Sequence, residues 1–276
     1  MPVPILAELL SVPPESIVVA DVGAAFFGDV GADDRKLTAE ASDAVWLAKT
    51  LDATLRQEFT ASQQDADAAF ERISSRIFDA FSAIAGKRCG DDRVACPSAC
   101  LAFLSVACRQ IEISYIGDCR VILELPEDGL CIASDMRIER FENLLLKDLI
   151  DLIRREPDAD PKSALRERFR ATRGFLNRSD GYWVVHPTVE WLRGLQKTAA
   201  PAFEGQTALL VSDGFYRLVN LFGAHTDRSL LAAAKERGLK ALLKTLRELE
   251  ERESIEDYPR MKRHDDASAC LIEIAA

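Results

Sequence analysis

The sequence predicts an α+β fold in which a mainly antiparallel sheet core is covered by helices. Helical segments come first, four strand-like runs follow one another in the middle of the chain, and helices return before a last strand. Strands that are joined by short connections usually pair as antiparallel neighbours, so this order favours helices layered on a sheet. The 276 residues are expected to form a single domain, 1–276, with 48% hydrophobic residues available for its core.

The first part of the chain predicts a strand or a short helix at 3–12, a turn at Pro13 and Pro14, and a buried strand in SIVVAD that ends at Asp21. Thr38 is expected to cap a helix that runs to about residue 58, and a second helix is expected over 65–85. The expected buried stripe of the first helix is Ala41, Val45, Ala48, Leu51 and Leu55, and that of the second is Ala66, Phe70, Ile73, Ile77, Phe81 and Ile84.

The middle and the end of the chain change period more than once. Strand-like runs are ACLAFLSVAC, IEISYIG, RVILEL and LCIAS between residues 99 and 134, and later GYWVVHP at 181–187, TALLVSDG at 207–214 and ASACLIEIA at 267–275. Helices are expected at about 138–155, 161–173, 227–237 and 239–253. Close spacing of the four middle runs favours antiparallel pairing.

Composition excludes several classes of function. The net charge is −10, and no concentrated basic face is apparent, so nucleic acid is not an expected partner. The apolar runs are shorter than the roughly 20 residues of a membrane helix, and the start lacks the basic region of a secretory signal. The seven cysteines form no C-x-x-C pair and indicate a reducing compartment. The expected location is the cytoplasm.

Three aspartates share one local setting. Asp21 and Asp213 end apolar strand-like runs, and Asp265 and Asp266 precede the last strand, ACLIEI. A carboxylate at the end of a strand is held rigidly and is able to point into a shared cleft. Carboxylates without a histidine or cysteine cluster suit hard ions such as Mg²⁺ or Mn²⁺. Each aspartate taken singly is weak support for a site, since such residues commonly form turns.

Five segments together carry a family resemblance. They are VVADVGA at 18–24, PSACLAFL at 97–104, SYIGDCR at 114–120, LLVSDGFYRLV at 209–219 and HDDASACLIEI at 264–274. In this order the segments resemble the motifs of the metal-dependent protein serine/threonine phosphatases, the type 2C phosphatases, in a bacterial branch. The resemblance covers about residues 17–275 and implies a four-layer α-β-β-α sandwich, with two mainly antiparallel sheets covered by helices.

The resemblance also implies a site with two Mn²⁺ or Mg²⁺ ions. Asp21 would bridge the ions with help from the backbone near Gly23, Asp213 would hold one ion, and Asp265 would match the aspartate of the closing motif. These three aspartates are the expected catalytic residues. Asp118 would lie near the ions and hold a further ion or a water. The implied reaction is hydrolysis of phosphoserine or phosphothreonine in a phosphoprotein by metal-activated water.

Phosphate contact is expected from Arg35 or Arg178, although each also fits an ordinary surface cation. His264 could act as an acid near the leaving group, or simply lie in an exposed turn.

One departure from the family motif leaves an alternative open. Val22 stands between Asp21 and Gly23, where the family has glycine directly after the aspartate. A catalytically weak or inactive relative that binds phosphoproteins as a regulatory module is therefore the second hypothesis. A third, that VADVGAAFFGDVG is a nucleotide-binding loop, is disfavoured because its spacing is not G-x-G-x-x-G and no βαβ alternation follows.

Overall fold

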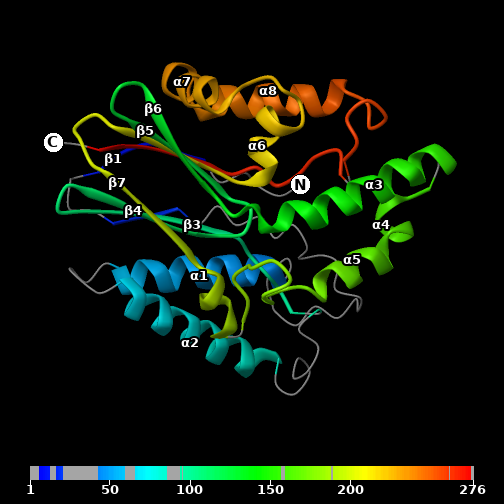
Figure 1. The fold of residues 1–276 in the computed structure, drawn as a ribbon, viewed down its shortest axis with the longest axis horizontal. Coiled ribbons are helices and arrows are strands. Elements are labelled where there is room, and N and C mark those ends of the chain that lie inside the picture. The colour runs from blue at the N-terminus through cyan, green and yellow to red at the C-terminus, as the bar shows by residue number, and fades with distance from the viewer. Residues whose placement is uncertain are drawn as a thin grey trace.

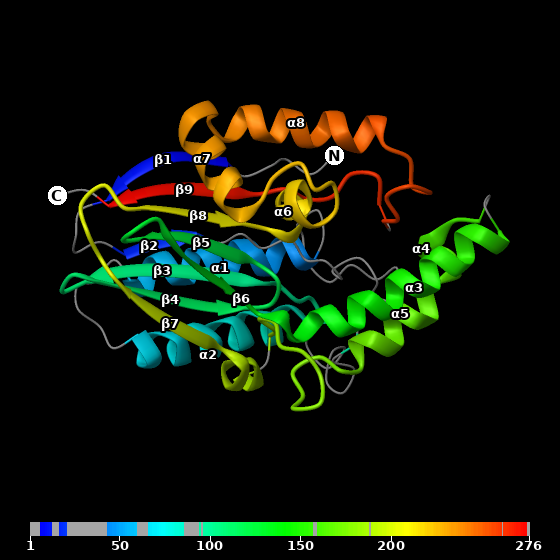
Figure 2. The same cartoon turned by 45° about the horizontal axis from the view of Figure 1, so that its top comes forward.

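The structure is a computed structural model that describes residues 6–12, 17–20, 43–59, 66–85, 94, 96–156, 159–187, 189–260 and 262–274. Within these ranges, every helix falls short of the length and apolar character that crossing a membrane requires. The elements lie in layers, with two sheets in the middle and helices on both outer sides (Figures 1 and 2). The α+β sandwich expected from the sequence is therefore confirmed.

Two sheets form the centre of the molecule. One has the strand order β1-β9-β8-β5-β6, and the other has the order β2-β3-β4-β7. Neighbouring strands are antiparallel, except that β1 and β9 are parallel. The strand bounds are β1 Leu6–Val12, β2 Ile17–Ala20, β3 Leu101–Ala107, β4 Gln110–Ile116, β5 Arg120–Leu125, β6 Gly129–Ser134, β7 Gln196–Pro201, β8 Thr207–Val211 and β9 Ala269–Ile274.

The main core lies between the two sheets. Leu104 and Ile113 from the four-stranded sheet belong to the same buried cluster as Val121 and Leu210 from the five-stranded sheet. Strand β8 is buried along its whole length, because helices cover its outer face while the other sheet covers its inner face. This double burial explains why the four residues after Thr207 in β8 are all apolar, whereas β4 alternates at its start.

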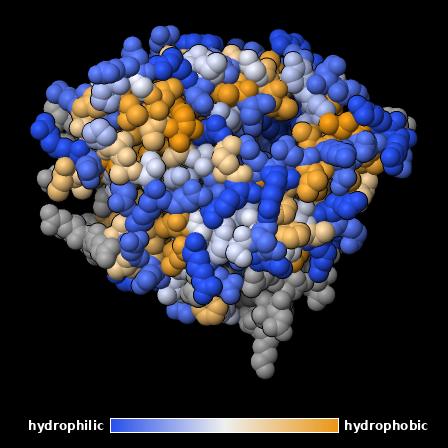
Figure 3. Space-filling view, viewed as in Figure 1, coloured by the Kyte–Doolittle hydropathy of each residue, from blue (hydrophilic) through white to orange (hydrophobic). Residues whose placement is uncertain are grey.

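Helices cover both outer faces. The four-stranded sheet carries α1 (Asp43–Phe59) and α2 (Ala66–Ala85), and the five-stranded sheet carries α6 (Asp213–Asn220), α7 (Asp227–Arg237) and α8 (Leu239–Arg252) (Figures 1 and 2). Two separate buried clusters attach them, one around Phe70, Phe103 and Trp191, and the other around Phe215 and Leu242. Figure 3 shows that hydrophobic residues on the surface gather in patches bordered by hydrophilic ones.

A further group of helices extends from one end of the sandwich. It contains α3 (Glu139–Arg155), α4 (Pro161–Ala164) and α5 (Arg166–Arg173), and the short 3-10 helix Met136–Ile138 leads into α3 (Figure 1). Phe141, Leu145 and Leu149 recur every four residues on α3 and pack in one cluster with Phe169 of α5. The other face of the first turns of α3 is left to line a cavity, which is described below.

Most expected elements are confirmed, but several details are wrong. The buried face of α1 is formed by Ala44, Leu47, Leu51 and Leu55, whereas Val45 is exposed. Ile84, which was expected in the buried stripe of α2, is also exposed. The segment 181–187 is not a strand, since its pairing consists of isolated bridges. Strand β7 and helix α6 were not expected from the sequence. The positions of Thr38, Ala41 and Gly86 lie outside the described residues.

Candidate functional site

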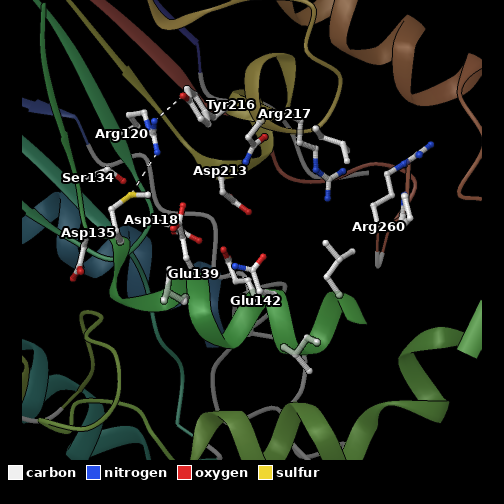
Figure 4. A pocket seen from close by; sticks show the side chains of 18 of the residues that line it. Asp118, Arg120, Ser134, Asp135, Glu139, Glu142, Asp213, Tyr216, Arg217 and Arg260 are labelled. Atoms are coloured by element: carbon white, nitrogen blue, oxygen red, sulfur yellow. Dashed lines mark hydrogen bonds between the residues drawn. The ribbon is translucent and has the colours of Figure 1, made fainter. Parts of the chain in front are cut away.

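A cavity of about 380 Å³ opens where α3 faces α6 at one end of the sheets. Acidic, basic and apolar side chains line it, as the close-up in Figure 4 shows. The charged residues that line it are Asp118, Arg120, Asp135, Glu139, Glu142, Asp213, Arg217 and Arg260. Two of the expected site residues, Asp118 and Asp213, therefore face one space. Asp265 is not among the lining residues of the described part of the chain.

The position of Asp213 is fixed by close packing between the end of β8, the start of α6 and the segment before β9. Ser212 caps α6 by accepting a hydrogen bond from the Phe215 amide at 3.4 Å, and Asp213 is the first residue of that helix. Ser212 Oγ also accepts from the Ser268 amide at 3.0 Å. A Cβ on Gly214 would lie 2.0 Å from the Asp266 carbonyl oxygen, so glycine is required for this approach.

Asp118 lies in the connection between β4 and β5. Gly117 has φ +80°, a conformation that favours glycine, and a Cβ there would collide with Cys100. The Asp118 Oδ2 atom is buried and has no hydrogen-bond partner among the described residues. Burial raises the pKa of Asp118, a hydrogen bond from Cys100 opposes that rise, and the carboxylates of Asp265 and Asp135 add to it.

Asp118, Asp213 and Glu142 form the acidic part of the cavity lining, which we call the acidic wall. Burial raises the pKa of Asp213 well above its usual value, and the negative charges of Asp118 and Asp265 raise it further. Burial, followed by the charges of Asp118 and Glu139, raises the pKa of Glu142 to about 8. Asp213 points down from α6 toward Asp118, and Glu142 rises from α3 on the other side (Figure 4). Carboxylates that raise each other's pKa create a negative potential that attracts a cation.

Asp265 lies in a different electrostatic setting. Its side chain is buried, and its Oδ2 atom accepts a hydrogen bond of 2.6 Å from Arg217 Nη2. The Lys262 ammonium lies 3.5 Å from Oδ1. Arginine and lysine therefore already neutralise this carboxylate.

The residues present fit a divalent metal ion only in part. Asp118 and Asp213 offer hard oxygen donors in one cavity, and the buried, unpartnered Oδ2 of Asp118 suits an ion. Asp265 does not fit, because protein cations occupy it. Within the described ranges, no three acidic, histidine or cysteine side chains come together as a ligand set.

The cavity arginines differ in how they are satisfied. Arg260 is buried and donates to backbone carbonyls, so its role is structural. Arg120 stacks on the Tyr216 ring and donates to the Tyr216 hydroxyl at 2.6 Å. Its Nη2 reaches only the Met136 sulfur at 3.7 Å, and its Nε has no partner among the described residues. Of these two arginines, Arg120 therefore has the guanidinium group with fewer hydrogen bonds to the protein.

Two further expected residues, Arg178 and His264, do not line the cavity. Arg178 is exposed and forms a paired contact with Asp180 at 2.9 and 3.0 Å, away from the lining residues. His264 contacts Glu250 and Glu251 at 3.0 and 2.8 Å. Asp21, Gly23 and Arg35 lie outside the described residues.

Three cavity residues were missed by the sequence interpretation. Arg217 follows Asp213 by four residues, so helical spacing would have placed both on one face of α6 if that helix had been expected. Arg120 ends the SYIGDCR segment beside Asp118. Nothing in the sequence distinguishes Glu142 from the other carboxylates of the helix 139–155, because only the packing of α3 against the sandwich brings it to the cavity.

Comparisons with known proteins give the class of this fold. No protein-family model matches the sequence, and no curated protein matches it. The solved serine/threonine phosphatase PstP/Ppp of Mycobacterium tuberculosis is similar, with a TM-score of 0.50, 15% identity, and coverage of 98% of this chain and 96% of that one. PppA of Pseudomonas aeruginosa has a TM-score of 0.47, 15% identity, and coverage of 93% and 96%. The PstP catalytic domain in complex with two manganese ions has a TM-score of 0.45, 16% identity, and coverage of 82% and 79%.

The chain therefore has the fold of the bacterial serine/threonine phosphatases of the PPM type.

Proposed function

We propose that this chain is a metal-dependent phosphatase that hydrolyses phosphoserine or phosphothreonine in proteins. The observation that carries the proposal is the convergence of Asp118 and Asp213 on one cavity in a phosphatase-type fold. Both carboxyls have raised pKa values, and one buried oxygen lacks a partner among the described residues. A cation is the natural complement of such a wall.

Asp118 and Asp213 would hold the ion, and Asp21 with the backbone at Gly23 remains the expected second part of the site. When bound, Mn²⁺ or Mg²⁺ lowers the pKa of water and neutralises phosphoryl charge. Arg120 is placed to donate to phosphoryl oxygens, since its guanidinium lines the same cavity. We prefer it for this role to Arg178, which pairs with Asp180 on the surface.

We propose that the apolar part of the cavity contacts the substrate. Leu145, Leu149 and Phe169 also line the cavity and belong to a buried cluster. They limit the access of water and give the aliphatic part of a substrate residue a surface to contact. Six cysteines of the described chain form no disulfide. This agrees with a cytoplasmic location, which we propose together with the phosphoprotein substrate.

Hydrolysis of an aryl phosphate and of a phosphothreonine peptide in Mn²⁺ tests the proposal. EDTA should abolish phosphate release, and Asp213→Asn should lower kcat/KM by at least about 100-fold. Asp79→Asn is a matched control, because Asp79 is exposed on α2 far from the cavity lining. Equal activity of the wild type and Asp213→Asn would end the proposal.

A second candidate is a phosphoprotein-binding module with little or no turnover. The ion pair between Asp265 and Arg217 favours it, because that aspartate was expected to bind metal. Tight binding of a phosphopeptide without phosphate release, in saturating Mn²⁺, would decide for this candidate.

A further inference from the structure

Arg217 is the centre of a buried ion network on α6. The side chain is 10% exposed, its Nη2 lies 2.6 Å from Asp265 Oδ2, and its Nη1 lies 3.1 Å from Glu250 Oε1. Asp265 and Glu250 are themselves buried. An arginine that bridges two buried carboxylates has few alternative partners, so it fixes both of them.

The same network satisfies the second oxygen of each carboxylate. Asp265 Oδ1 accepts from the Asp266 amide at 3.0 Å and lies 3.5 Å from Lys262 Nζ. Glu250 Oε2 lies 2.5 Å from Arg247 Nη1, and Arg247 also donates to the Asp265 carbonyl at 2.9 Å. Three protein cations therefore surround two carboxylates.

We infer that Arg217 takes the place of one of the two expected divalent ions, so that Asp265 is not a metal ligand and the site binds one ion. This inference rests on the proposed function for the existence of an ion at Asp118 and Asp213. Binding of a second ion at Asp265 would separate Arg217 from its carboxylate partner while the guanidinium stays buried. It would also place a second positive charge beside that guanidinium. Both effects oppose binding of the ion. The resemblance implied two ions and a free Asp265, and the contacts of this chain disagree with that implication.

The charge of Arg217 also acts on Asp213. It lines the cavity with Asp213, four residues before it on the same helix, and its charge opposes the rise in the pKa of Asp213. The guanidinium therefore provides positive charge at one end of the acidic wall, where the second ion was expected. Figure 4 shows Arg217 on the side of Asp213 that leads to Arg260.

Calorimetric titration of the metal-free full chain with MnCl₂ tests this inference without measuring activity. We expect one bound ion. Asp265→Asn should change the Kd less than about threefold, whereas Asp213→Asn should weaken binding at least about tenfold. A tenfold loss in Asp265→Asn, or two ions bound by the wild type, would overturn the inference.

Removal of the arginine gives the complementary test. Arg217→Gln should free Asp265 and raise the stoichiometry by one ion. The double variant Arg217→Met with Glu250→Gln removes one charge of each sign, and it replaces the single variant if the latter does not fold by circular dichroism. If the wild type takes up no Mn²⁺ at millimolar concentration, the proposed function fails on its own. Uptake by the folded arginine variant would then still support the inference, and no uptake would refute it.

Discussion

Glu142→Gln is expected to stabilise the metal-free protein at alkaline pH and to change it little at mildly acidic pH. Burial, and then the charges of Asp118 and Glu139, raise the pKa of Glu142 from its usual 4.5 to about 8. In the unfolded chain this carboxyl ionises near its usual pKa. Between the two values, the folded state therefore holds a proton that the unfolded state has lost.

The sign and the size of the effect follow from this proton. The free energy of unfolding falls as the pH rises through the window from 4.5 to about 8, by at most about 1.4 kcal/mol per pH unit. The whole window sets a ceiling of about 5 kcal/mol. Because the Glu142 side chain is partly exposed, solvent screening lowers this, and we expect a gain of about 1–3 kcal/mol for Glu142→Gln at about pH 9.

Urea denaturation in EDTA, at about pH 5.5 and about pH 9, measures the difference. Glu236→Gln is the matched control, because Glu236 is exposed on α7 and does not line the cavity. The control should shift the free energy of unfolding by a similar small amount at both pH values. If Glu142→Gln also shifted it equally at both, or destabilised the protein at the higher pH, the assigned burial of this carboxyl would be refuted.

Three further substitutions test the packing around the site and the buried face of α1. Gly214→Ala should cost about 1–3 kcal/mol of stability and weaken Mn²⁺ binding, because its Cβ would lie 2.0 Å from the Asp266 carbonyl oxygen; a wild-type melting temperature and Kd would contradict this. Arg173→Met should cost about 1–3 kcal/mol, since it removes the donor to two backbone carbonyls and the Ser98 hydroxyl; an unchanged urea midpoint would count against it. Leu47→Ala, at a fully buried position of α1, should cost about 2–5 kcal/mol, and comparable loss in the exposed Val45→Ala would show that the assigned face is wrong.

The sequence predicted those strands and helices whose burial leaves a periodic pattern. Strand β8 is apolar after Thr207 because both of its faces are covered, and α2 shows a clear stripe through Phe70, Ile73 and Ile77. Strand β7 was missed because it pairs only with β4 at a sheet edge and contains the polar residues Gln196 and Lys197 and a proline, Pro201. Helix α6 was missed because it has only eight residues and begins inside a segment that was interpreted as a turn.

The segment 181–187 shows a different limit. Its apolar and aromatic composition predicted a strand, and its side chains are indeed buried, including Tyr182, Trp183 and Val185. Its backbone, however, makes only isolated bridges, of which one joins Val185 to Ala99. Composition therefore indicated burial correctly, while strand pairing depends on a neighbour that no local pattern specifies.

Two of the segments that carry the family resemblance bring an aspartate to the cavity. Asp118 and Asp213 both line it, and their role as metal ligands stays a prediction. The charge partners were not predictable, because Arg217 meets Asp265 only after α6 and the segment before β9 have packed together. Arg178 matched the chemistry of phosphate binding by residue type alone, and its neighbour Asp180 satisfies it at the surface.

Buried carboxylates need a compensating charge, and this chain supplies it in two ways. For Asp265 and Glu250 the compensation is permanent, because arginine stays protonated at all accessible pH values and is held between them. For Asp118 and Asp213 the described structure has no comparable ion pair, and burial raises the pKa of both carboxyls, which makes the protonated form more favourable than in an exposed aspartate. A proton leaves readily when a divalent cation arrives, whereas a buried guanidinium does not. This contrast is the reason why we propose Asp118 and Asp213, and not Asp265, as the ligands of an ion.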